Sequence, residues 1–109
     1  MPLHFHKMHG AGNDFVLIDA RGKSFALAAR EASLIADRHL GVGCDQILVL
    51  RESSIAGFLL RYEIWNADGS PAAQCGNGAR CVGLYLHLNG EGGAGTIDLE
   101  SPSGPVSLS

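Results

Sequence analysis

The sequence predicts an α+β domain in which a curved mixed sheet wraps around a central helix. One observation is a set of short segments with alternating or continuous apolar residues, at residues 3–9, 15–18, 47–50, 58–65, 96–99 and 106–108. A second is a pair of segments, residues 26–40 and 77–88, with apolar residues at helical spacing. In the later segment the apolar residues cover nearly the whole circumference, which is typical of a buried helix. A sheet that curves around this helix would bury it.

The first elements are a strand pair and a helix. Residues 3–9 and 15–18 flank a polar, glycine-containing loop at residues 10–13, so we expect an antiparallel hairpin. The helix expected at residues 26–40 would end where Gly41 offers a natural stop.

The middle of the chain alternates strands and turns. Residues 47–50 predict a short buried strand, and a longer strand is expected at 58–65, beginning with Phe58 on its apolar face. The Asn, Asp, Gly and Pro content of residues 66–71 indicates a turn, after which the apolar helix at 77–88 follows.

Size and charge limit the function. The chain has 109 residues, of which 46% are hydrophobic and 17% charged, so residues 1–109 are expected to form one globular domain. The formal net charge of -3 argues against nucleic acid or an anionic membrane as the partner. No apolar run reaches the roughly 20 residues that span a bilayer, and the N-terminus lacks a signal-peptide pattern. We therefore expect a cytoplasmic protein.

The cysteines point to a reactive thiol. Three cysteines without a C-x-x-C pair fit neither a disulfide framework nor a usual zinc site, so we expect reduced thiols and no bound metal. Cys75 precedes the helix at 77–88, where the helix dipole and unpaired N–H groups lower the pKa of a thiol and can bind a carboxylate. Cys44 and Cys81 are expected to pack in the core, as free cysteines usually do.

Three segments of the chain together resemble the diaminopimelate epimerase family. They are residues 6–15 (HKMHGAGNDF), 38–46 (RHLGVGCDQ) and 66–81 (NADGSPAAQCGNGARC). They occur in family order at family-like spacing, and the resemblance covers nearly the whole chain. It implies one half of the two-domain diaminopimelate epimerase-like fold, in which each domain wraps a sheet around a central helix and the active site lies between the domains.

The resemblance also implies an activity and a set of site residues. The family interconverts LL- and meso-diaminopimelate in lysine and peptidoglycan biosynthesis, without a cofactor, and each domain supplies one catalytic cysteine. Cys75 matches the cysteine of the first domain. The residues that match substrate contacts of that domain are Asn13, Gln46, Asn66, Gly76 and Asn77.

The second cysteine of the family belongs to a C-terminal domain that is not part of this chain. We therefore expect the isolated chain to be inactive and to need that missing domain as its partner. The resemblance implies a homodimer as well.

Two alternatives stay open. Proline-type racemases and other amino-acid epimerases share the fold and the two-cysteine plan, although Asn13, Gln46 and residues 74–78 favour the diaminopimelate branch. A non-catalytic binding or assembly fragment is the other alternative, and the lack of a second domain favours it.

Overall fold

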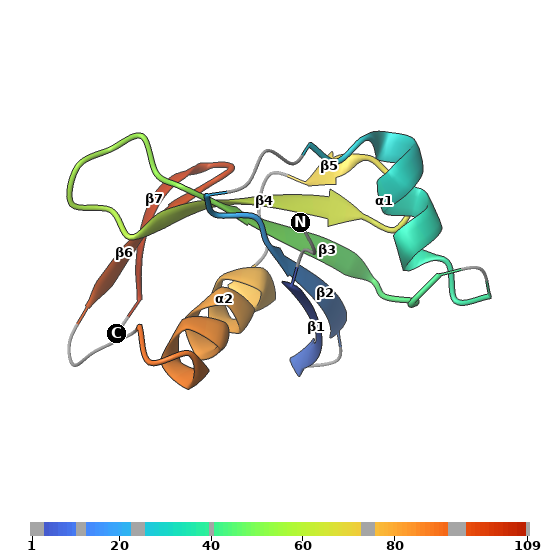
Figure 1. Cartoon of the computed structure of the whole chain (residues 1–109), viewed down its shortest axis with the longest axis horizontal. Helices are drawn as coiled ribbons and strands as arrows, with labels where there is room; N and C mark the ends of the chain where they lie inside the picture. Colours follow the sequence, from blue (N-terminus) through green and yellow to red (C-terminus); the bar gives the residue numbers. More distant parts are fainter. Residues whose placement is uncertain are drawn as a thin grey trace.

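The computed structural model describes residues 4–10, 13–22, 26–39, 41–72, 76–91 and 96–108. Within these ranges it contains seven strands and two helices (Figure 1). In chain order they are β1 (His4–Gly10), β2 (Asn13–Asp19), α1 (Ala29–Ala36), β3 (Gln46–Arg51), β4 (Leu60–Asn66), β5 (Pro71–Ala72), α2 (Gly76–Leu88), β6 (Ile97–Ser101) and β7 (Gly104–Leu108).

All of these strands belong to one mixed sheet. Its order is β1-β2-β3-β4-β6-β7, and β5 pairs with β4. The β2–β3 and β4–β6 pairs are parallel, and the other pairs are antiparallel. The predicted mixed sheet is confirmed, and so is the predicted hairpin of the first two strands, which pair from His4 opposite Asp19 to Gly10 opposite Asn13.

The sheet has an apolar core on each face, because successive side chains of a strand point to opposite faces. The buried residues of the α2 face are Phe15, Leu17, Leu48, Leu50, Leu60, Tyr62, Ile64, Cys81, Val82, Tyr85, Leu86 and Leu99. Those of the α1 face are Val16, Ile18, Ala20, Leu27, Ala32, Ala36, Cys44, Ile47 and Val49. Figure 1 shows the two helices on opposite sides of the sheet. Strands β2 and β3 are buried on both faces, which explains their nearly continuous apolar sequences.

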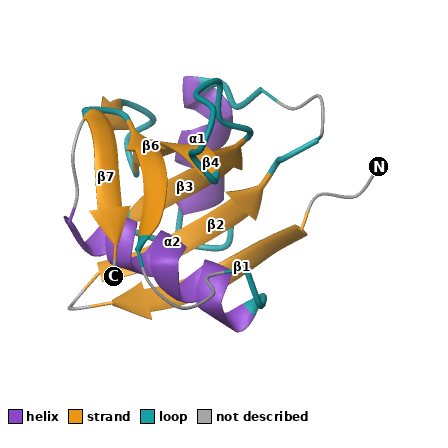
Figure 2. Ribbon diagram, turned by 90° about the vertical axis from the view of Figure 1, so that its left-hand side faces the viewer, coloured by secondary structure: helices purple, strands orange, loops and turns teal. Residues whose placement is uncertain are grey.

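The sheet curves around α2, as predicted. Strands β1 and β7 stand at opposite ends of the strand order, yet both contact α2. A flat sheet could not bring both of its edges to one helix. Figure 2 shows the end of β7 approaching α2. At this contact Gly83 permits a close approach, because a Cβ there would lie 3.1 Å from Leu108 Cδ1.

Helix α2 is not buried on all sides, which corrects the expectation from its composition. Val82 and Leu86 are fully buried, whereas Leu84 is 47% and Leu88 73% exposed. The reason is geometric: the sheet covers the side of α2 that faces it. On the outer side, these two leucines border an open cavity of about 470 Å³ between α2 and β1.

Helix α1 is shorter than the predicted 26–40. It begins at Ala29, because Ala28 is extended and its N–H donates to the Glu31 carboxylate at 3.0 Å. It ends at Ala36, because Asp37 is extended and its carboxylate accepts the N–H of His39 at 2.7 Å. A side chain that bonds the nearby backbone competes with the helix, and this local bond ends α1 before Gly41.

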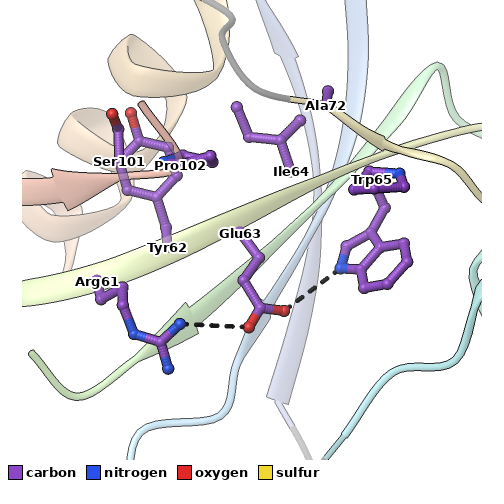
Figure 3. A pocket seen from close by; sticks show the side chains of 9 residues that line it. Arg61, Tyr62, Glu63, Ile64, Trp65, Ala72, Ser101 and Pro102 are labelled. Carbon is purple, nitrogen blue, oxygen red and sulfur yellow. Dashed lines mark hydrogen bonds and ion pairs between the residues drawn. The ribbon is translucent and has the colours of Figure 1, made fainter. Parts of the chain in front are cut away.

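Strand β4 starts later than predicted, and β5 was missed. Phe58 lies outside β4 because its N–H closes a turn onto the Ile55 carbonyl at 3.2 Å. Pro71, expected as the last residue of a turn, and Ala72, for which no element was predicted, pair with β4. Beside β4, where its pairing changes from β6 to β5, lies a cavity of about 380 Å³ (Figure 3).

None of the described helices is long and apolar enough to cross a membrane.

Candidate functional site

Three predicted substrate-binding amides lie at one end of the sheet. Asn13 is the first residue of β2, Gln46 the first of β3 and Asn66 the last of β4. Because β2 and β3 are parallel and β4 runs against β3, these three positions meet at the same end. Gln46 pairs directly with Asn66, and its partner on β2 is Phe15, two residues from Asn13.

All three amides belong to the α2 face of the sheet. Asn13 is in phase with Phe15, Gln46 with Leu48, and Asn66 with Ile64, and all of these partners are buried in the α2-side core. The apolar core of this face therefore ends in a row of half-buried neutral polar side chains. Amides bind carboxylate and ammonium groups without adding a competing base.

Hydrogen bonds orient the Asn66 side chain. Gln46 Nε2 donates to Asn66 Oδ1 at 3.1 Å, and Asn66 Nδ2 donates to Ser70 Oγ at 3.2 Å. Ser70 in turn donates its hydroxyl to the Asp68 carboxylate at 2.6 Å. The turn also closes through the Asn66 N–H, which bonds the Ser70 carbonyl at 2.7 Å. The turn that follows β4 thus orients the Asn66 side chain, and Asn66 in turn orients Gln46 through their hydrogen bond.

Helix α2 begins at this same end of the sheet. Near the start of β2, Cys81 Sγ lies 3.5 Å from Met8 Sδ of the neighbouring strand β1. At the end of β2, the Tyr85 hydroxyl donates to the Asp19 carboxylate at 2.8 Å. α2 therefore runs in the direction of β2, and its first turn is nearest Asn13. Gly76 and Asn77 form this first turn, where backbone N–H groups lack acceptors within the helix and the dipole is positive.

The structure thus brings together the regions of all five predicted binding residues. Gly76 and Asn77 are described by their backbone, as the first residues of α2. The predicted catalytic residue, Cys75, lies outside the described residues, immediately before α2 in the sequence. Its role stays a prediction.

The other two cysteines pack in the core, which confirms the expectation for them. Cys44 is 2% and Cys81 6% exposed, on opposite faces of the sheet. Burial raises the pKa of the Cys44 thiol, although Lys7 and Arg38 oppose the effect. A thiol that is buried and protonated is a poor nucleophile or base.

A cluster of charged side chains lies next to the amides in the chain but on the opposite face of the sheet, and it was not predicted from the sequence. Asp14 bonds His9 Nδ1 at 3.0 Å and Arg38 Nη1 at 3.1 Å, and Arg38 Nη2 reaches Asp45 at 3.2 Å. The hydrogen bonds from His9 and Arg38 lower the pKa of Asp14 below its ordinary value. Asp14 directly follows Asn13 and Asp45 directly precedes Gln46, and this adjacency to predicted site residues was the signal that the sequence offered.

The sequence of this chain is similar to those of known proteins. The family model described as "Diaminopimelate epimerase" matches residues 5–109. The chain belongs to the diaminopimelate epimerase family. Curated diaminopimelate epimerases from Aromatoleum aromaticum and Xylella fastidiosa are 47% and 48% identical to it, over 97% and 93% of this chain. A third, from Xanthomonas euvesicatoria, is 50% identical over 92%. The chain spans only 38%, 36% and 35% of the length of these three relatives.

Solved structures with the same fold come from a second group of proteins. A phenazine biosynthesis protein of the PhzF family from Enterococcus faecalis has a TM-score of 0.65 at 13% identity, covering 90% of this chain and 34% of its own. A PhzF-family protein from Bacillus anthracis has a TM-score of 0.64 at 21% identity, covering 96% and 33%. At these identities the likeness shows the fold alone. The fold predicted for this diaminopimelate epimerase family member is thereby confirmed.

Proposed function

We propose that this chain forms one half of the active site of a cofactor-independent diaminopimelate epimerase. The observation that carries the proposal is the convergence of Asn13, Gln46 and Asn66 at the end of the sheet where α2 begins. The family membership supports the same function. The substrate would be LL- or meso-diaminopimelate, with the inverted carbon held at this end of the sheet.

In the proposed reaction two thiols act on opposite faces of the α-carbon. The Cys75 thiolate takes the α-proton and becomes a thiol, while a thiol on the other face gives its proton to the carbon and becomes a thiolate. The proton count is unchanged and the configuration is inverted. The second thiol would come from the remaining part of a longer protein, since the chain spans 38% of its Aromatoleum aromaticum relative.

The start of α2 has the electrostatics that this reaction needs. Removing the α-proton places negative charge next to the substrate carboxylate, and fixed dipoles stabilise such charge. The backbone N–H groups of Gly76 and Asn77 would bind the carboxylate, and the positive end of α2 would also favour the Cys75 thiolate. The first turn of α2 carries no acidic residue that would oppose either effect.

The proposal includes a homodimer and a cytoplasmic location for the complete enzyme. The family resemblance supports the homodimer. The mass of the intact protein in solution tests the homodimer, and fractionation of its host cells tests the location.

The decisive experiment uses a chimera in which this chain replaces the matching residues of the Aromatoleum aromaticum relative. In deuterium oxide, turnover should place deuterium at the α-carbon of diaminopimelate. Cys75→Ala should lower kcat by about a thousandfold, as expected for loss of a general acid–base. Cys44→Ala is the matched control, because Cys44 is buried on the other face of the sheet. Retained turnover in Cys75→Ala would refute the proposed role.

A substrate panel separates the alternatives. Deuterium uptake into proline or another amino acid, but not into diaminopimelate, would indicate a different racemase of this fold. No uptake into any amino acid would favour a binding or assembly fragment.

A further inference from the structure

We propose that Arg38 is a positioning residue that sets the spacing between Asn13 and Gln46 by bridging Asp14 and Asp45. The inference rests on the proposed function, because it assigns a role at that same site. We call Arg38 and the two carboxylates the Arg38 bridge.

The bridge begins at the backbone of two parallel strands. The Asp45 N–H donates to the Asp14 carbonyl at 3.0 Å, and the Asp14 N–H donates to Asp45 Oδ2 at 2.8 Å. The Asp45 side chain thus stands in for a backbone acceptor and extends the pairing of β2 with β3 past its first register pair, Phe15 with Gln46. Two hydrogen bonds, one donated from each residue, therefore join Asp14 of β2 to Asp45 immediately before β3.

Arg38 fixes the two carboxylates relative to each other. Its Nη1 donates to Asp14 Oδ2 at 3.1 Å and its Nη2 to Asp45 Oδ1 at 3.2 Å. A guanidinium is planar and rigid, so its two nitrogens hold their partners at a set separation. Asp14 also accepts from His9 at 3.0 Å, and Lys7 Nζ lies 3.8 Å from it.

A tight loop holds Arg38 in place. The Gly43 N–H donates to the Ile35 carbonyl at 3.0 Å and its carbonyl accepts from Lys7, so the loop is tied to both α1 and β1. Gly43 has φ +83°, and a Cβ there would lie 3.0 Å from Arg38 Cγ. The Arg38 stem therefore packs against the one residue type that leaves room for it.

The bridge and the amides are adjacent in the chain but on opposite faces. Asn13 directly precedes Asp14, and Gln46 directly follows Asp45. Consecutive Cα atoms are about 3.8 Å apart, so a shift of either aspartate backbone moves the neighbouring amide with it. A shift of the Gln46 side chain in turn moves Asn66, because the two side chains share a hydrogen bond of 3.1 Å.

The solvent exposure of the Arg38 bridge indicates that it affects the neighbouring side chains more than the stability of the whole domain. The side chains of Arg38 and Asp45 are 55% and 46% exposed, and exposed ion pairs contribute little to global stability. A group that adds little stability but determines where two binding side chains lie affects ligand binding more than unfolding. This distinguishes positioning from a merely structural role.

The kinetic test uses Arg38→Met in the chimera with the Aromatoleum aromaticum relative. We expect KM for diaminopimelate to rise about tenfold, the effect of losing a charge-assisted contact, with kcat within threefold of the parent. Arg38→Lys should raise KM by less, because one ammonium can keep one of the two carboxylates. Arg51→Met is the matched control: Arg51 pairs with Glu63 at 2.9 Å, at the other end of β3. An unchanged KM in Arg38→Met, or an equal rise in Arg51→Met, would overturn the inference.

A second test is independent of activity. In the 109-residue chain, Arg38→Met should speed solvent exchange of the Gln46 side-chain amide protons, observed by nitrogen-edited NMR, and Arg51→Met should not. Equal exchange in the two variants would contradict the inference. If the unmodified chimera shows no epimerase activity, the proposed function fails, and this measurement still decides whether Arg38 positions the amide.

Discussion

At the scale of single residues, one partly buried contact fixes the far end of α2, the helix that begins at the candidate site. The Tyr85 hydroxyl donates to Asp19 at 2.8 Å, and Arg21 bonds both Asp19 and Glu91 at 2.7 to 3.0 Å. Burial, and then the Asp19 carboxylate, raise the pKa of Tyr85 to about 12, so the phenol stays a neutral donor. This contact joins α2 to the end of β2, while the start of α2 lies at the amides.

We predict that Tyr85→Phe destabilises the chain by about 1.5 kcal/mol, because it removes a hydrogen bond to a charged group. The midpoint of urea unfolding measures the effect. Leu88→Ala, at the exposed last residue of α2, is the control and should change the midpoint little. Equal midpoints for Tyr85→Phe and the parent would show that the hydroxyl contributes nothing.

At the scale of elements, the turn after β4 packs closely against the start of α1. Gly69 has φ +88°, and a Cβ there would lie 2.3 Å from the Ala29 carbonyl oxygen. The same turn holds Asn66 through Ser70. Packing of α1 against this turn therefore affects the Asn66 side chain, which is proposed to bind the substrate.

We expect Gly69→Ala to cost about 3 kcal/mol, because it combines an unfavourable backbone conformation with a collision against α1. Gly57→Ala is the matched control: Gly57 has φ +89°, and a Cβ there would meet no described atom within 4 Å. That variant should lose about 1 kcal/mol, from backbone strain alone. Thermal unfolding compares the two, and equal losses would mean that the collision with Ala29 is relieved at no cost.

At the scale of the whole molecule, carboxylates on several elements link stability to pH. Hydrogen bonds lower the pKa of Asp14 and Glu91, with His9 and Arg21 as the respective main partners. Burial alone would raise the pKa of Asp19, but bonds from Arg21 and Tyr85 outweigh it and lower the pKa to about 2. A lowered folded-state pKa stabilises the fold above the ordinary value, and this stabilisation is lost as pH falls toward the folded value.

We therefore predict that stability falls between about pH 4 and pH 2, with Asp19 contributing about 1 kcal/mol of the loss after allowance for solvent screening. Urea midpoints measured from pH 6 to pH 2 test this. Asp19→Asn should lower the midpoint at pH 6 and flatten its acid dependence. A midpoint that stays constant through this range, or an unchanged slope in Asp19→Asn, would contradict the assignment.

Local pattern was sufficient for most of the elements, whereas the site role of the three amides was predicted from the family resemblance and stays a prediction. Alternating or continuous apolar residues predicted β1 to β4, and the apolar run after Cys75 predicted α2 within one residue of its start at Gly76. The burial of Cys44 and Cys81 also followed from residue type. These properties depend on near neighbours in the chain, so the order of residues was enough to predict them.

Long-range packing determines which elements meet. The parallel pairing of β2 with β3, the short strand β5 and the open outer side of α2 depend on partners distant in the chain. The Arg38 bridge likewise joins Arg38 to residues 24 and 7 positions away in the chain, one on β2 and one immediately before β3. Periodicity carries no information about such partners, because strand pairing and ion pairs form only when packing of the two cores brings the segments together.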